Sequence, residues 1–202
     1  LMRRSGLVEG LFLSSGLCGD AVRTQDRLLD TVEIVRSRYQ FQGYVHLKVM
    51  PGATADQVER AGLIADRVSV NLEAPNPQRL AMIAPDKQFG ALLDLMGRIG
   101  RLQSQRIGYA PAGPTTQFVA GSAGESDREL LSCADLLYQR HGLRRAYYSP
   151  FRPVYGSPLE EVPPMSALRE HRLYQADALL RQYGFVAEEM AFEDDGSLDG
   201  RA

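Results

Sequence analysis

The stretch Arg67-Val68-Ser69-Val70-Asn71-Leu72-Glu73 carries the alternation that decides the fold. Side chains of a strand point alternately to its two faces, so the two valines and the leucine share one side. Three polar residues share the other side and continue to the end of the stretch: Ser69, Asn71 and Glu73. Polar groups that face an interior are costly unless they bind something. We therefore expect one side that packs against helices and another that holds a ligand.

Short apolar runs and helical patterns alternate on both sides of this stretch. We predict further strands over residues 10–16, 44–49, 116–120 and 144–148, the first of them ending in a turn of small residues. Helical spacing of apolar residues predicts helices over residues 23–39, 54–63, 78–83, 88–102, 126–140 and 166–183. Regular alternation of strands and helices indicates βα units and a parallel sheet.

The number of these units falls short of a complete barrel. Eight βα units need roughly 250 residues, whereas the chain has 202. We expect an α/β fold that is either an incomplete barrel or an open doubly wound sheet. The barrel should occupy residues 1–155, and residues 156–202 should add a loop, a long helix and an acidic tail. We expect the tail to fray around residues 193–196.

Composition narrows the function mainly by exclusion. The formal net charge of −2 gives no global signal for nucleic acid, whose binding usually needs a basic face. No apolar run approaches the ~20 residues that span a bilayer. Cys18 and Cys133 make no metal-ligand spacing, and a cytoplasmic location is expected. No Walker, GxGxxG, HExxH or GxSxG motif occurs, so phosphoryl transfer and serine hydrolysis have no support.

The first predicted strands offer two candidate ligand positions, because ligands of parallel βα folds bind where the strands end. The turn Ser14-Ser15-Gly16 either presents backbone groups to a polar ligand or is simply a tight turn. His46 and Lys48 share one face of the next strand. Lys48 is a catalytic candidate, since a lysine there can pair with a carboxylate, form a Schiff base, bind a phosphate or extend to solvent. His46 is more typical of a satisfied core histidine.

The later strands add further candidates. Gln117 lies in a strand that ends in Gly121–Gly124, where a flat ligand can approach the backbone closely. Glu125 follows at the start of a helix, where it either contacts the ligand or favours the helix dipole. Tyr147 and Tyr148 are candidate catalytic residues, and we expect one or both to face the centre of the barrel.

Taken in chain order, these strand ends resemble radical S-adenosylmethionine (SAM) enzymes. The resemblance is to the DNA modification/repair subfamily, which is found alongside uracil-DNA-glycosylase-like partners. The matching stretches are EGLFLSSG (9–16), GYVHLKVMPGA (43–53), ADRVSVNLEAP (65–75), APAGPTTQFVAGSAGESD (110–127), LRRAYYSPFRPV (143–154) and LREHRLYQADALLRQYGF (168–185). They span nearly the whole chain. The resemblance implies a partial (βα)6 TIM-type barrel that binds SAM across the strand ends, with DNA or a uracil-DNA-glycosylase-like protein as partner.

The resemblance also implies roles for individual residues. Ser14–Gly16 matches the position whose backbone holds the SAM amino group. The polar residues of 69–73 match positions near the ribose and carboxylate of SAM. Gly121 and Glu125 match the glycine-rich motif beside the adenine.

Two features depart from the family pattern. The family's first strand is followed by a CxxxCxxC loop, whose thiolates hold the [4Fe–4S] cluster that generates a 5′-deoxyadenosyl radical from SAM. This sequence contains no such loop, and neither Cys18 nor Cys133 replaces it. We therefore expect the first strand with its cluster loop to be missing and the chain to be inactive as a fragment. Pro114 stands where the family usually has Gln, and proline removes a backbone donor.

Two other functions remain open from the sequence. One is a cluster-free barrel lyase or aldolase that uses Lys48 as a Schiff base. The other is a non-catalytic interaction protein that keeps the barrel.

Overall fold

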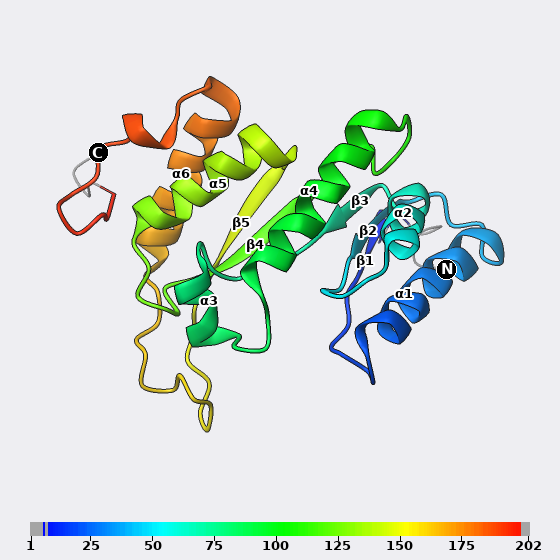
Figure 1. Cartoon of the computed structure of the whole chain (residues 1–202), viewed down its shortest axis with the longest axis horizontal. Helices are drawn as coiled ribbons and strands as arrows, with labels where there is room; N and C mark the ends of the chain where they lie inside the picture. The colour runs from blue at the N-terminus through cyan, green and yellow to red at the C-terminus, as the bar shows by residue number, and fades with distance from the viewer. Residues whose placement is uncertain (1–5, 7, 199–202) are drawn as a thin grey trace.

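Five parallel strands form one sheet in the order β1-β2-β3-β4-β5 in the computed structural model, which describes residue 6 and residues 8–198. The strands are β1 (Gly10–Leu13), β2 (Tyr44–Lys48), β3 (Arg67–Ser69), β4 (Thr115–Ala120) and β5 (Arg145–Pro150). The sheet curls into half of a barrel with helices on its outer face (Figure 1). The predicted partial barrel of parallel strands is thus confirmed. Residues 1–5, 7 and 199–202, which belong to the two expected domains, lie outside the described residues.

The helices carry local sequence signals at several of their ends. They are α1 (Ala21–Ser37), α2 (Ala55–Ile64), α3 (Pro77–Ile83), α4 (Phe89–Gln105), α5 (Asp127–His141), α6 (Ala167–Tyr183) and a 3-10 turn (Ala187–Glu189). Thr54 and Ser126 form capping boxes at α2 and α5. Gly142 and Gly184 end α5 and α6 in the left-handed conformation that glycine adopts without strain. No helix in the described part of the chain has the length and apolar character needed to cross a membrane.

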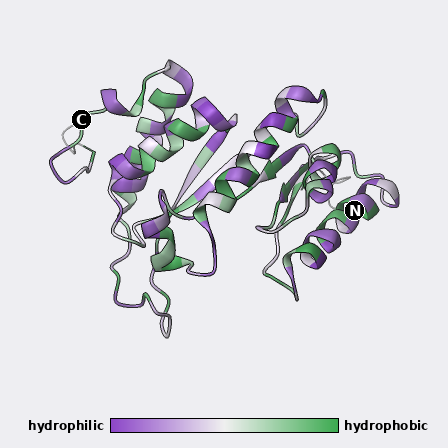
Figure 2. Ribbon diagram, viewed as in Figure 1, coloured by the Kyte–Doolittle hydropathy of each residue, from purple (hydrophilic) through white to green (hydrophobic). Residues whose placement is uncertain are grey.

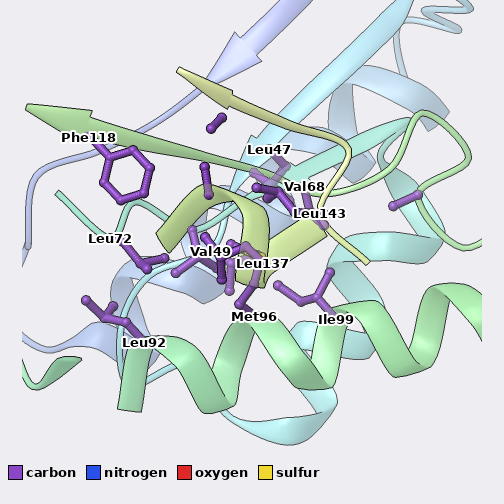
Figure 3. Packing of buried hydrophobic residues seen from close by; sticks show 14 of the residues in the cluster. Leu47, Val49, Val68, Leu72, Leu92, Met96, Ile99, Phe118, Leu137 and Leu143 are labelled. Atoms are coloured by element: carbon purple, nitrogen blue, oxygen red, sulfur yellow. The ribbon is translucent and has the colours of Figure 1, made fainter. Parts of the chain in front are cut away.

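The core lies between the outer face of the sheet and the helices. Figure 3 shows Val49, Val68 and Leu72 pointing toward Leu92 and Met96 of α4. Each of these side chains is essentially fully buried, which contributes roughly 1.5–3 kcal/mol per side chain relative to exposure. Neighbouring helices also pack side by side around the sheet, from α1 against α2 through α5 against α6. The helices carry both apolar and polar residues (Figure 2), as expected for elements that bury one face.

The pairing between β3 and β4 contains a β-bulge. Ser69 pairs with Thr115 in the ladder. The N–H of Val70 then donates to the Thr115 carbonyl (3.1 Å), and the N–H of Glu73 donates to the Gln117 carbonyl (2.9 Å). Between these two hydrogen bonds, the chain after β3 advances by three residues, from 70 to 73, whereas β4 advances by two, from 115 to 117. This one extra residue bends the strand and ends its regular pairing.

The hydroxyl of Thr116 bridges the bulge. It donates to the carbonyl of Val70 (2.8 Å) and accepts from the N–H of Leu72 (3.1 Å), and all three groups are buried. The regular strand therefore stops at Ser69 instead of running to Leu72 as the sequence predicted. The physical reason is that a threonine side chain replaces the ladder hydrogen bonds there.

The C-terminal segment is continuous with the barrel core. Leu173, Ala176 and Leu180 of α6 belong to the same buried cluster as the strands. The prediction that the acidic tail frays is wrong as far as Leu198, which forms an antiparallel bridge with Phe192. The N–H of Leu198 donates to the carboxylate of buried Asp127 (2.9 Å), and this bond anchors the turn.

Replacing Thr116 by valine tests the bulge. Thr116→Val keeps the side-chain shape but leaves the Val70 carbonyl and Leu72 N–H unpaired, which should cost about 1–3 kcal/mol of unfolding free energy. The measurement is urea denaturation, with hydrogen exchange of the Leu72 amide as a local readout. Thr31→Val is the matched control, because the exposed Thr31 hydroxyl bonds only a carbonyl of its own helix. Equal losses in the two variants would contradict the role of the Thr116 bridge.

Candidate functional site at the carboxyl ends of the strands

The inner face of the half-barrel carries polar side chains. His46 pairs with Arg67, and Lys48 pairs with Ser69. Residues paired across a parallel ladder point to the same face, and the alternating residues of both strands are buried under the helices. These four side chains therefore line the inner face, with Asn71 one step beyond Ser69. The arrangement agrees with the two-sided pattern of the sequence.

A charged cluster lies where β2 and β3 end. The ammonium of Lys87, from the loop between α3 and α4, is 2.8 Å from a carboxylate oxygen of Glu73. Lys48 lies in the same local field: burial lowers the pKa of its ammonium, while the charge of Glu73 opposes this shift and that of Lys87 adds to it. The structure thus brings Lys48, Glu73 and Lys87 together at the mouth of the half-barrel.

The bulge fixes the backbone of Glu73 in an unusual conformation. Its φ of 67° lies in the left-handed region, which few residues other than glycine adopt. Both of its backbone groups bond β4: the N–H donates to Gln117, and the carbonyl accepts from the N–H of Val119 (2.8 Å). Strained residues that are held by their surroundings cluster at functional sites. Glu73 therefore reaches the mouth because of the bulge and not by simple alternation.

A small cavity opens beside this cluster. Its volume is about 270 Å³, and Glu73, Lys87, Val119 and Phe151 are among its lining residues. Ligand pockets usually measure roughly 300–1,000 Å³. The cavity therefore accommodates one part of a ligand.

The loop after β4 is held by a buried carboxylate. Glu125 accepts hydrogen bonds from the N–H groups of Gly121 and Ala123, the latter at 3.0 Å. The guanidinium of Arg169 lies 3.7 Å from the same carboxylate. Glu125 thus fixes the glycine-rich loop from within and does not present its side chain to the inner face. Gly121, with φ of 90°, lies against the side chain of Met165, and this leaves no room for a Cβ atom.

The two candidate tyrosines of β5 point to opposite faces. Tyr147 pairs with Gln117 on the inner face, and the Arg145 guanidinium lies 5.1 Å from its ring centre. Tyr148 is fully buried on the outer face, where its hydroxyl donates to Asp177 (3.2 Å). Burial, with the charge of Asp177 second, raises the pKa of Tyr148 well above its usual value. Of the two, Tyr147 alone lies at the expected site.

The turn Ser14–Gly16 follows β1 at the same end of the sheet. Leu13 pairs with Leu47, so the turn begins beside Lys48. All three turn residues are exposed, and the Ser15 hydroxyl donates to the Gly16 carbonyl (2.6 Å). The turn is therefore at the correct end for a ligand but is not packed against the charged cluster.

The expectation that His46 is a satisfied core histidine is wrong. Its ring lies on the inner face, 4.6 Å from the ring of Phe12 between centres. Its Nε2 atom is buried and has no hydrogen-bond partner among the residues that the structure describes. Burial, together with the charge of Arg67, lowers the pKa of His46 to about 4. The imidazole is therefore neutral at pH 7.

The described residues do not fit an iron–sulfur cluster. No group of three or more His, Cys, Asp or Glu side chains among them is placed to hold a metal ion. Cys18 is exposed after β1, where Arg27 donates to its sulfur at 3.2 Å. Cys133 is in α5, and burial raises the pKa of its thiol to about 12. A [4Fe–4S] cluster needs several neighbouring thiolates.

Lys87 was missed from the sequence. It lies in the short loop between α3 and α4 and not at the end of a strand. A single lysine in a polar loop follows no periodicity, so only the fold places it beside Glu73. The neighbouring Pro85-Asp86 dipeptide marks the turn but does not indicate which way Lys87 points.

Removing the Glu125 carboxylate should loosen the loop without unfolding the barrel. Glu125→Ala leaves the buried amide of Ala123 and the half-buried amide of Gly121 unpaired, which should cost about 1–3 kcal/mol of unfolding free energy. Hydrogen exchange should accelerate at Gly121 and Ala123 in particular. Glu161→Ala serves as the control, since Glu161 is exposed in a neighbouring loop. Unchanged exchange at Gly121 in Glu125→Ala would show that the carboxylate does not hold this loop.

Comparison with known proteins gives a likeness in fold and none in sequence. Neither the scan of protein-family models nor the search of curated proteins gives a match. Among solved structures, a domain of a pyruvate-formate lyase-activating enzyme from Bacteroides vulgatus is similar, with a TM-score of 0.58 and 11% identity. The match covers 89% of this chain and 97% of that domain. At this identity the likeness establishes the shared fold alone.

Proposed function

We propose that this half-barrel belongs to the radical SAM superfamily and binds SAM at the carboxyl ends of its strands. The observation that carries the proposal is the polar mouth, where Lys48 lies in the field of Glu73 and Lys87, and where these last two residues line a small cavity. The fold likeness to a domain of a pyruvate-formate lyase-activating enzyme agrees with this superfamily. The segments that resemble the superfamily occur in the same order along the chain, and they include every strand end of the site.

The chemical groups at the mouth suit the parts of SAM. The ammonium of Lys48 is placed to pair with the SAM carboxylate, as a lysine at a partly buried site does with an anion. Asn71 and Glu73 offer an amide and a carboxylate to the ribose hydroxyls. Lys87 holds the Glu73 carboxylate in place and balances its charge. The exposed carbonyls of the turn 14–16 are available to the SAM amino group.

In the resembled superfamily, SAM supplies a 5′-deoxyadenosyl radical when a reduced [4Fe–4S] cluster is beside it. The described residues provide no ligands for that cluster, so we assign to this chain the binding and orientation of SAM alone. We propose further that the substrate is a nucleic acid and the location cytoplasmic. The support for these two statements is the resemblance to the DNA modification/repair subfamily, including its uracil-DNA-glycosylase-like partner.

Titration with SAM tests the proposal. Isothermal calorimetry should detect binding to the wild-type chain, and Asn71→Ala should weaken it about tenfold, the effect of losing one hydrogen bond at a partly buried site. Gln42→Ala is the matched control, because Gln42 is an exposed amide before β2, at the opposite end of the sheet. Circular dichroism confirms that each variant is folded. Absence of wild-type binding, or equal binding by Asn71→Ala, would overturn the proposal.

A second function is favoured by one observation, the half-buried position of Lys48. Burial lowers the pKa of its ammonium, and a neutral amine is what attacks a carbonyl to form a Schiff base. Treatment with borohydride and a panel of aldehydes and keto acids separates the two functions by mass spectrometry. We expect no adduct on Lys48, because the proposed function places the SAM carboxylate against its ammonium. A stoichiometric adduct that is absent from Lys48→Met would establish the lyase or aldolase function instead.

A further inference from the structure

An aromatic and cationic cluster lies on the inner face of β1, β2 and β3, on the amino-terminal side of Lys48 and Ser69. We define the stacking cluster as Phe12, Tyr44, His46 and Arg67. Phe12 pairs with His46 and His46 with Arg67 across three strands. Phe12 is 62% exposed and Tyr44 is 40% exposed. Large aromatic rings on the inner face of a sheet are therefore open to solvent, where burial against a ligand would stabilise them.

The polar atoms of the stacking cluster are incompletely satisfied. Nη1 of Arg67 and Nε2 of His46 are both buried, and neither has a hydrogen-bond partner within residues 8–198. Nε of Arg67 donates to the hydroxyl of Tyr44 at 2.5 Å. Because this hydroxyl is neutral, the hydrogen bond does not compensate the charge of the guanidinium. Buried polar groups normally find partners, and each exception requires an explanation. A ligand that brings an anion to Arg67 supplies the missing partner.

The charges around the stacking cluster favour an anionic ligand. The strand side chains that the register places on the inner face include three cations: Lys48, Arg67 and Arg145. Among the described strand ends, Glu73 is the residue that brings a carboxylate to this face. The ammonium of Lys87 lies 2.8 Å from this carboxylate and neutralises its charge. The inner face is therefore locally positive although the whole chain has a net charge of −2. An apolar protein segment would gain nothing from these cations.

We propose that the stacking cluster binds a nucleotide unit, with the base stacked on Phe12 and the phosphate at Arg67. Stacking on an exposed aromatic ring beside a cationic track is how single-stranded nucleic acids are held without reading their sequence. Phe12 pairs with His46, and Lys48 is the next residue of β2 on the same face. A bound strand would thus reach the mouth. The inference deepens the proposed function by placing its substrate, yet nucleotide binding is measured without SAM.

Fluorescence anisotropy with a labelled twelve-nucleotide oligo-dT at low salt tests the proposal. The wild-type chain should bind with an affinity that falls as salt rises, because phosphate contacts release counterions. Phe12→Leu and Arg67→Gln should each weaken binding by at least about fivefold, the usual effect of losing a stacked base or its cation. The matched controls are Tyr39→Leu and Arg38→Gln, since both residues lie after α1 and outside the sheet. These controls should bind like the wild type.

Two further arms identify the source of the ligand. If dTMP competes at the same nucleotide concentration, the result supports a free nucleotide as the ligand. If unlabelled oligo-dT competes and dTMP does not, the result supports a nucleic-acid strand. Either result supports a nucleotide unit. No wild-type binding, or binding that inorganic polyphosphate matches and Phe12→Leu leaves unchanged, would overturn the proposal. If oligo-dT binds but SAM does not, the proposed function fails and this inference stands.

Discussion

The half-barrel depends on how its two parts join at the boundary between β3 and β4. The ladder there consists of Ser69 against Thr115, and beyond it the Thr116 hydroxyl bonds the backbone of β3 in place of a regular partner. Threonine suits this position because its hydroxyl both donates and accepts while its methyl group packs in the core. The bulge that results turns Glu73 into the left-handed conformation and toward Lys87. A local backbone irregularity thus builds the charged mouth.

The inner face divides into two chemical zones along the strands. Near the carboxyl ends, Lys48, Glu73 and Lys87 form a mixed-charge cluster that suits a ligand with both signs of charge. Near the amino ends, the stacking cluster offers rings and a guanidinium that bonds the hydroxyl of Tyr44. We propose that SAM binds the first zone and the nucleotide unit the second. The strand register places both zones on the inner face of the sheet.

Sequence alone predicted the fold well because its signals are local and periodic. The N-caps at Thr54 and Ser126 and the stop at Gly142 are written in adjacent residues. The bulge was not predictable, since the alternation continues through residues 70–73 while the hydrogen bonds do not. Tyr148 was assigned a possible inner position because neighbouring tyrosines are equivalent until the register is known.

The central claim is that the mouth of the half-barrel binds SAM, and mapping the amide resonances of the chain tests it most directly. Nitrogen–proton correlation spectra recorded during a SAM titration report every backbone amide at once. If SAM binds at the mouth, the amide resonances that shift should be those of residues 14–16, 48, 69–73, 87 and 117–121. The resonances at the amino ends of the strands should stay unchanged. Shifts centred on the helices, or no shifts at saturating SAM, would contradict it.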